Sequence, residues 1–466
     1  MLGHYLEPGD SEAILDWLGS PATENASAIV CSTDMIAYGG LVASRTPAVP
    51  PYTAIFRLRE LAAIHAARPR VPLDVFGTIM RLAPTGLPDL PATASYWATS
   101  ATVANLAAYA NLPDPPQSAD DIARAQHLSE LIGPKALGEY RASRARDRDT
   151  DLYALQLTAE GAFDRIVLGQ DDAGPVGLHV RDVAALTSAA RRFGLGRRAS
   201  IEPGADELGM VLLAAVFAHD AGWRPTIRVR YSRPDAAQIN DPLEFVPIDV
   251  TISRLIEAAG AQRTEGPADI DLFVNVGATS DEEEGAFVDA IASDVSAGTS
   301  ATVADLTFLD GPPPSEEQQR LMQLLIQRKL AGAIDGYASW NTTANTVGTS
   351  IATALAVGAG KRTHSYDQLA HAQFMLDRYA DDYAFHQFVR PVLNSELRAM
   401  GTDPTFLTDD VAAEVGHETR ALLWPQALSL LQEIYPQYRD AGITITLPWQ
   451  RTFETQLEVR LNALAI

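Results

Sequence analysis

Acidic side chains gather in two short blocks, each directly after an apolar segment. The first is Asp171-Asp172, which precedes an Ala-Gly-Pro turn, and the second is Glu-Pro-Gly-Ala-Asp-Glu at 202–207. Cleavage of a glycosidic bond requires two carboxyl groups, one to protonate the leaving oxygen and one to act as base or nucleophile. We therefore predict that Asp172 and Glu207 are the catalytic pair of a glycoside hydrolase or a related sugar-processing enzyme. The other acids of the two blocks are predicted to bind substrate: Asp171, Glu202 and Asp206.

A structural role competes with catalysis for most of these acids. Aspartate is a preferred helix N-cap, and the Asp-Asp pair precedes a helix expected to begin near His179. The last two acids of the second block precede a helix expected at 208–217, where the helix dipole favours acids. Glu202 falls inside a strand and has no such role. Its carboxylate therefore needs a partner, either a substrate hydroxyl or an arginine such as Arg228 or Arg230.

Amide, aromatic and basic side chains complete the predicted site. In the Trp-Asn-Thr-Thr-Ala-Asn block at 340–345, the aromatic ring could stack on a sugar while the amides bind its hydroxyls. The competing interpretation is a core tryptophan followed by an asparagine that caps a helix at 343–357. For Asp34, the interpretation that competes with substrate binding is a turn-forming role before Gly39-Gly40. The residues predicted to bind hydroxyls or to orient carboxylates are Asp34, Arg45, Arg228, Asn275, Trp340, Asn341 and Asn345.

Short apolar, β-branched segments must position these side chains. Continuous apolar runs are typical of strands that helices cover on both faces, and spacings of about 30–45 residues are typical of the strand–helix units of a parallel α/β fold. In such folds the carboxyl ends of the strands form the ligand crevice. The pattern leaves open whether the sheet is open and Rossmann-like or closes into a barrel. The segments are 28–32, 73–79, 165–169, 199–202, 226–231, 271–276, 301–306, 333–337 and 443–447.

Helical patterns fill the rest of the chain. Residues 92–160 contain a charged run, 141–151, which we expect to be a solvated helix face, a substrate-facing arm being the alternative. A Pro-rich stretch at 310–315 is expected to be a linker, and a C-terminal helix is expected after the strand at 443–447. Three regions follow: an N-terminal α/β unit with a helical insertion at 1–160, a central parallel α/β unit with most site motifs at 161–362, and a mainly helical region with one late strand at 363–466.

The composition excludes several classes of protein. A formal charge of −23, from 59 acids and 36 bases, repels phosphate backbones and anionic lipids, so nucleic acid and membrane are poor partners. Cys31 is the only cysteine, so neither an intrachain disulfide nor a cysteine-based zinc site is possible. We find no Walker A, GxSxG or HExxH motif and predict no cofactor. No signal peptide or membrane-spanning segment is found, so we expect a cytoplasmic protein and leave a homo-oligomer open.

Four blocks stand out together, in a fixed order along the chain. They are Ser-Thr-Asp-Met-Ile-Ala-Tyr-Gly-Gly-Leu-Val-Ala-Ser-Arg at 32–45, Asp-Asp-Ala-Gly-Pro at 171–175, Glu-Pro-Gly-Ala-Asp-Glu at 202–207 and Gly-Tyr-Ala-Ser-Trp-Asn-Thr-Thr-Ala-Asn at 336–345. Together they resemble the motifs of the bacterial domain-of-unknown-function family 4127. The resemblance covers nearly the whole chain and implies that the blocks form one site, but it brings no established activity. It also implies a further strand, ending in an acidic motif with Arg-Pro, before Pro8-Gly9-Asp10, so the first α/β unit is expected to be incomplete.

Two alternatives to a glycosidase fit the same residues. A non-catalytic sugar-binding or sensing protein would use the aromatic and amide groups without turnover. A divalent-metal hydrolase would use Asp34, Asp171 and Asp172 as ligands, since Mg²⁺ and Ca²⁺ prefer carboxylates. The leading hypothesis is a glycosidase that acts on a small carbohydrate without a metal.

Overall fold

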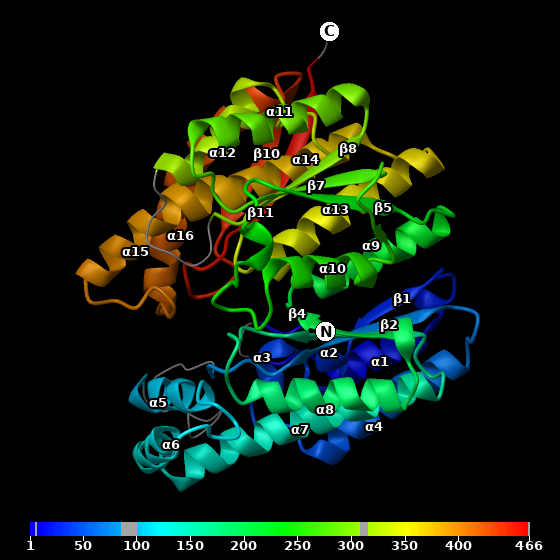
Figure 1. The fold of residues 1–466 in the computed structure, drawn as a ribbon, viewed down its shortest axis with the longest axis vertical. Helices are drawn as coiled ribbons and strands as arrows, with labels where there is room; N and C mark the ends of the chain where they lie inside the picture. Colours follow the sequence, from blue (N-terminus) through cyan, green and yellow to red (C-terminus); the bar gives the residue numbers. More distant parts are fainter. Residues whose placement is uncertain (5–6, 85–99, 308–315, 465–466) are drawn as a thin grey trace. The chain divides into compact units, whose positions relative to one another are not determined.

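The chain folds as two compact units. The computed structural model describes residues 1–4, 7–84, 100–307 and 316–464, so the predicted linker at 310–315 lies outside the described residues. The first unit contains Met1–Leu212 and Asn240–Arg254, and the second contains Leu213–Ile239 and Leu255–Ile466. Each unit has its own parallel sheet (Figure 1). The predicted limit near residue 160 is absent because strands on both sides of it pair in one sheet.

The first sheet contains four parallel strands in chain order. They are β1 (Ile29–Ser32), β2 (Leu73–Ile79), β3 (Arg165–Gln170) and β4 (Ala199–Pro203). Ser32 is paired in register with Phe76, Ile79 with Gln170, and Gln170 with Pro203. The segments that leave β2, β3 and β4 therefore start side by side at one edge of the sheet.

Apolar side chains from alternate strand positions hold this sheet to its helices. Val75 of β2 and Ile166 and Leu168 of β3 share a core with α4 (Pro51–Ala66), α7 (Pro134–Ala159) and α8 (His179–Arg192). Figure 1 shows α7 and α8 lying along this face of the sheet. Phe76 points to the opposite face, because side chains alternate along a strand, and its ring lies against Gly209 at the start of α9 (Leu208–Asp220).

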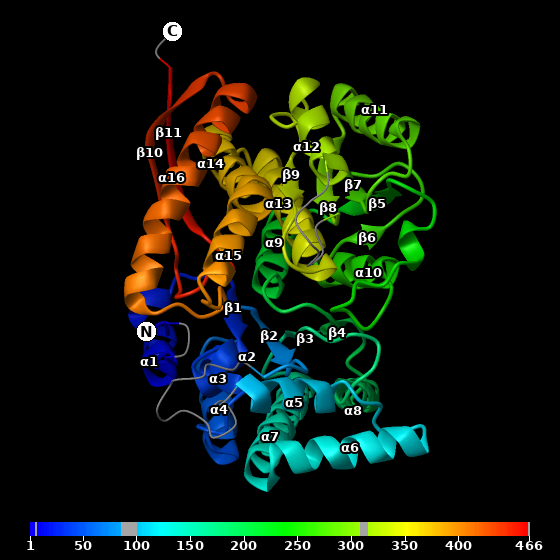
Figure 2. The same cartoon turned by 90° about the vertical axis from the view of Figure 1, so that its left-hand side faces the viewer.

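The remaining helices of the first unit lie around this layer. The helix α1 (Ser11–Gly19) packs on α4, and the short α2 (Thr33–Tyr38) and α3 (Leu41–Ser44) follow β1 directly. The helices α5 (Ser100–Ala110) and α6 (Ala119–Ile132) pack on one another, and α6 also contacts α7 (Figure 2).

The second sheet contains five parallel strands in the order β6-β5-β7-β8-β9. They are β5 (Thr226–Tyr231), β6 (Gln262–Arg263), β7 (Ile270–Asn275), β8 (Ser300–Asp305) and β9 (Gly336–Ala338). Figure 1 shows α11 (Asp281–Ala297) and α12 (Glu316–Gln327) on one face and α13 (Thr343–Thr363) on the other. The helix α10 (Ile248–Ala258) is divided between the units, because its residues up to Arg254 belong to the first unit and the rest to the second. Both described sheets are open, so the prediction of a parallel α/β fold is confirmed, and the barrel alternative is not the form that these sheets take.

A helical layer and a hairpin complete the second unit. Its helices are α14 (Gln368–Arg378), a π-helical segment (Tyr379–Val389), α15 (Arg390–Ala399) and α16 (Asp409–Ile434). The helix α16 packs on β10 (Tyr438–Thr446), which pairs antiparallel with β11 (Gln456–Ala463) (Figure 2). The predicted C-terminal helix is wrong, because its place is taken by β11. The sequence Gln-Leu-Glu-Val-Arg-Leu-Asn-Ala alternates polar and apolar residues with the period of a strand.

The described helices are too short or too polar for a membrane span: none combines the length and the hydrophobicity that crossing a bilayer requires.

Gly169 of β3 tests how tightly the sheet edge is packed. A Cβ at this position would lie 2.2 Å from the carbonyl oxygen of Gly204 and 2.7 Å from a methyl carbon of Leu208. We expect Gly169→Ala to lower the free energy of unfolding by about 3 kcal/mol, since a close-packed backbone cannot give way. Gly138→Ala is the matched control: Gly138 lies in α7 with nothing within 4 Å, so alanine should be neutral or stabilising by up to about 1 kcal/mol. Urea unfolding followed by circular dichroism measures both, and equal midpoints would contradict the expected packing.

Candidate functional site

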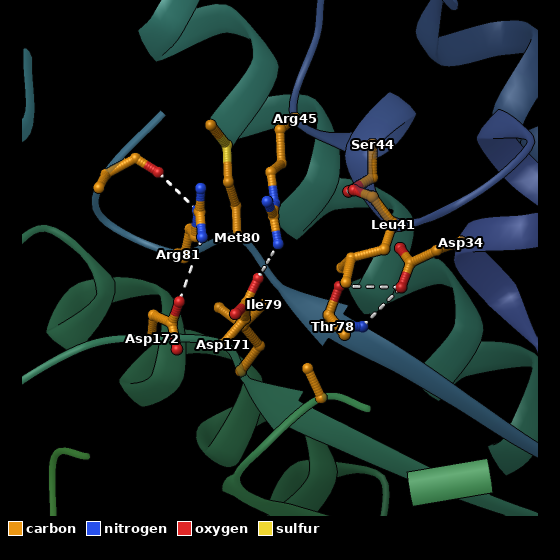
Figure 3. A network of polar contacts seen from close by, with 12 residues as sticks. Asp34, Leu41, Ser44, Arg45, Thr78, Ile79, Met80, Arg81, Asp171 and Asp172 are labelled. Atoms are coloured by element: carbon orange, nitrogen blue, oxygen red, sulfur yellow. Dashed lines mark hydrogen bonds and ion pairs between the residues drawn. The ribbon is translucent and has the colours of Figure 1, made fainter. Parts of the chain in front are cut away.

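Polar side chains meet at the carboxyl ends of β1, β2 and β3 (Figure 3). Asp34 lies in the first turn of α2, and its Oδ2 accepts hydrogen bonds from the backbone N and the Oγ1 of Thr78, both 2.9 Å long. Asp34 is 3% exposed, and burial raises its pKa to about 6 although the Thr78 hydrogen bonds and the charge of Arg45 act to lower it. The predicted turn-forming role is thus replaced by a link between α2 and β2.

A buried ion pair between Arg45 and Asp171 lies beside this link. Arg45 follows α3 directly, and one of its terminal nitrogens binds Asp171 Oδ2. The backbone N of Asp171 also donates to the carbonyl oxygen of Ile79, 3.3 Å away, which fixes the residue after β3. Burial acts to lower the pKa of Arg45, but the charges of Asp171 and Asp172 outweigh it and the pKa is raised.

Asp172 occupies the more open end of the same row of charges. Its Oδ2 lies 3.2 Å from Nη1 of Arg81, whose Nε donates to the carbonyl oxygen of Ala83 at 2.8 Å (Figure 3). About a quarter of each side chain is exposed, 27% for Asp172 and 24% for Arg81. Burial raises the pKa of Asp172 to about 6, and the neighbouring charge of Asp171 adds to this effect. We call Asp34, Arg45, Arg81, Asp171 and Asp172 the first row.

The charged run at 141–151 supports this row from behind, so the predicted solvated helix face is wrong. Asp147 accepts a hydrogen bond from the backbone N of Met80 (3.0 Å), and Arg144 donates to the carbonyl oxygen of Arg81 (3.0 Å). Burial, together with other aspartates nearby, raises the pKa values of Asp147 and Asp151 well above their ordinary range. The buried polar residues of this part of α7 are Ser143, Arg144, Arg146, Asp147, Thr150 and Asp151.

The second acidic block forms the turn between β4 and α9. Glu207 is fully buried, its Oε2 accepts from the backbone N of Ala205 (3.1 Å), and burial raises its pKa well above the ordinary range. Asp206 is exposed, and its negative charge acts on both Arg45 and Asp172. Of the acids in this block, Asp206 is therefore the one that is both exposed and electrostatically coupled to the first row.

Glu202 has a different partner from the one predicted. It is buried and accepts a hydrogen bond of 2.7 Å from Ser200 Oγ, and its charge acts on Arg254. The predicted arginines, Arg228 and Arg230, belong to the second unit and pair with Asp271 instead. Arg228 binds Asp271 from the middle of β5, so it does not reach a strand end.

Helix capping does not account for the Asp-Asp pair. The helix α8 begins at His179, its N-cap is Leu178, and no side chain caps it. The N-cap of α13 is likewise Thr342, whose Oγ1 accepts from the backbone N of Asn345. The predicted asparagine cap of α13 is therefore wrong. Helix capping, the explanation that competes with catalysis for Asp171 and Asp172, does not apply at α8.

The predicted site residues divide between the two units. In the second unit, Asn275 Nδ2 donates to Asp305 Oδ1 (3.1 Å), and Trp340 Nε1 donates to Thr349 Oγ1 (3.2 Å). Asn345 is buried, whereas Asn341 is partly exposed with a φ of 53°. The first unit contains Asp34, Arg45, Asp171, Asp172, Glu202, Asp206 and Glu207, and the second contains Arg228, Asn275, Trp340, Asn341 and Asn345.

Two groups of residues that contribute to the first row are absent from the sequence prediction: Arg81 and the buried polar residues of α7. For each group, the sequence contains a pattern that could have identified it. Arg81 follows β2 by two residues, so the strand-end rule that selected Asp34 and Asp171 also applies to it. The buried polar residues of α7 continue the helical spacing of its apolar residues Leu137, Tyr140, Ala154 and Leu155. Among the described residues, no three His, Cys, Asp or Glu side chains are arranged to hold a metal ion.

Comparison with known proteins gives one match. A family model described as "Protein of unknown function (DUF4127)" matches residues 1–458, which confirms the resemblance carried by the four blocks. No curated protein and no solved structure matches the chain.

Burial of Asp34 predicts a pH dependence of stability. Its pKa is about 6 in the folded protein against 3.8 for an ordinary aspartate, so the folded state binds more protons between these values. Stability should therefore fall as the pH rises from about 4 to 6, by up to about 3 kcal/mol for this group. We expect Asp34→Asn, whose amide oxygen still accepts from Thr78, to remove that part of the dependence. Urea unfolding at several pH values measures it, with Asp16→Asn on the exposed side of α1 as the control; an unchanged slope in Asp34→Asn would contradict the assignment.

Proposed function

The chain belongs to this family of unknown function, DUF4127, and from the chemistry of its first unit we propose that it is a glycoside hydrolase acting on a small carbohydrate. Asp172 is the general acid in this proposal. The description of the family carries no activity, so the support comes from the arrangement of the first row alone.

The observation that carries the proposal is the state of Asp172. A general acid must hold its proton near the working pH and must reach the substrate. The pKa of Asp172 is raised to about 6 by burial and by the charge of Asp171, while a quarter of its side chain stays exposed. Asp171, paired with Arg45, is held as the neighbouring negative charge. Two adjacent carboxyl groups with different surroundings are typical of an acid–base site.

We assign the second carboxyl group of the reaction to Asp206 in place of the predicted Glu207. Glu207 is fully buried, and its raised pKa favours the neutral form, which is a poor base and a poor nucleophile. Asp206 is exposed and its charge acts on Asp172. Glu207 then positions the turn that carries Asp206, through its hydrogen bond with Ala205.

The reaction follows from these roles. The proton of Asp172 moves to the glycosidic oxygen as the bond from that oxygen to the anomeric carbon breaks. In one route Asp206 takes a proton from the attacking water, which inverts the configuration. In the other, Asp206 attacks the anomeric carbon and forms a covalent ester; water, deprotonated by Asp172, then displaces Asp206, and the two displacements together retain the configuration. Arg81, 3.2 Å from Asp172, stabilises the carboxylate that forms when the proton leaves.

The wider assignments remain predictions from the sequence. A cytoplasmic location and a small carbohydrate as partner are part of this proposal. Sugar binding without turnover would leave the raised pKa of Asp172 without a use, so we place it second.

Asp172→Asn tests the acid role. The amide cannot donate the proton, so kcat on alkyl glycosides should fall by about 10²–10⁴-fold. Dinitrophenyl glycosides need little protonation of the leaving oxygen and should be hydrolysed at rates close to those of the unmodified protein. In the unmodified protein, kcat should fall as the pH rises above about 6, because the protonated form of Asp172 is consumed.

Two further variants complete the experiment. Asp206→Ala should lose activity on both kinds of substrate, and added azide should restore turnover of the dinitrophenyl substrate. Asp149→Asn, on the exposed side of α7, is the control and should retain full activity. The proposal fails if Asp172→Asn hydrolyses alkyl glycosides as fast as the control, or if a panel of glycosides gives no turnover at all.

A further inference from the structure

A second row of polar side chains crosses the carboxyl ends of β7, β8 and β9. Asn275 is paired in register with Asp305, and Ala304 with Ala338, so Ser339 follows β9 beside Asp305. Asn275, Asp305 and Ser339, which we call the second row, are at most 6% exposed. This row lies within the second unit and shares no residue with the proposed catalytic site.

Asp305 has an unused hydrogen-bonding atom. Its Oδ1 accepts from Asn275 Nδ2 (3.1 Å) and from the Oγ1 (2.7 Å) and N (3.2 Å) of Thr307. Its Oδ2 is buried and has no hydrogen-bond partner among the described residues, and the whole side chain is 1% exposed. A buried acceptor without a partner is costly, which makes it a signal of a missing ligand or water.

A cavity of about 340 Å³ lies one hydrogen bond away from Asp305. Thr307, which donates to Asp305 Oδ1, lines this cavity, and so does Gly277, whose N donates to Asn275 Oδ1 (3.1 Å). The charge of Glu284, another lining residue, acts on Asp305, and with burial as the main cause the pKa of Asp305 is raised to about 6. The cavity and the second row are therefore joined by direct hydrogen bonds.

The charges that line the cavity are already balanced. Arg320 binds Glu284 (2.7 Å) and Asp281, and Arg233 binds Asp235 (2.8 Å). The start of α11 is capped as well, because Ser280 Oγ accepts from the backbone N of Glu283. An ionic ligand would have to break one of these pairs. A neutral ligand with several hydroxyls would not, since each hydroxyl both donates and accepts.

We propose that this cavity binds a neutral polyol of about the size of a monosaccharide. Its hydroxyls would accept from Arg233 and donate to Glu284 and to the hydroxyl of Thr307, and the volume suits such a ligand. The site is independent of the proposed hydrolysis: a chain without glycosidase activity would still bind polyols here.

Ligand-observed saturation-transfer NMR on the full chain tests the proposal. The probes are glucose, mannose, galactose and myo-inositol, with inorganic phosphate and glycine as ionic comparisons. At least one polyol should bind, and Thr307→Val and Arg233→Gln should each weaken its Kd by about tenfold. Thr363→Val, at the exposed far end of α13, is the matched control and should bind as the unmodified chain does.

The outcomes separate this site from the first row. Asp172→Asn should keep its polyol affinity; loss of binding in that variant would move the ligand to the first row and overturn the proposal. Binding of only phosphate or glycine, or of no probe at all, would also overturn it. Thermal unfolding checks that Thr307→Val is folded, and if it is not, undiminished binding by Arg233→Gln decides against the site.

Discussion

The ion pair between Arg45 and Asp171 is the interaction on which the rest of the first row depends. Removing two charges from water is costly, and only close pairing offsets that cost. Arg45 reaches Asp171 because the chain turns sharply between α2 and α3 at Gly39-Gly40, whose φ values of 92° and 141° favour glycine. With Asp171 held in this way, the charge next to Asp172 is fixed. Burial raises the pKa of Asp172, and the charge of Asp171, which Arg45 holds in place, adds to that rise.

Near this ion pair, burial and the surplus of acidic side chains both raise the pKa values of buried aspartates. Asp34, Asp147 and Asp151 influence one another electrostatically, and burial raises the pKa of all three. Each acid that stays protonated avoids the cost of a buried charge and gains a donor for a hydrogen bond. The polar stripe of α7 thus lets the edge of the sheet hold more carboxyl groups than there are arginines to pair with them. Side chains of α7 therefore fix the backbone at Met80 and Arg81 and interact electrostatically with Asp34, although these residues lie far away in the sequence.

Sequence reasoning succeeded where one local pattern determines the outcome. Every predicted apolar segment overlaps an observed strand. Continuous apolar runs suit covered parallel strands, which explains all of these segments except 443–447, which lies in the antiparallel hairpin. The expectation that residues after the carboxyl ends of parallel strands lie close together is also met by Asp34, Arg45 and Asp171. Sequence reasoning failed where burial depends on partners elsewhere in the chain: the charged run at 141–151 resembles a solvated helix face, and only the contacts with Met80 and Arg81 reveal that it is buried. The expected C-terminal helix is also wrong, because Gln456–Ala463 alternates polar and apolar residues with the period of a strand and forms β11.

The four sequence blocks do not have equivalent surroundings. Three of them belong to the first unit and the block at 336–345 belongs to the second. The chain passes between the units three times: within α9, after Ile239 and within α10. The first row contains more carboxyl groups than arginines, and the carboxyl group at its end, that of Asp172, is partly exposed. In the second row, the charges around the cavity are paired and the unused atom, Asp305 Oδ2, is a hydrogen-bond acceptor. Proton transfer needs the first kind of environment and recognition of hydroxyls needs the second, so the difference in charge balance by itself argues for separate tasks in the two units.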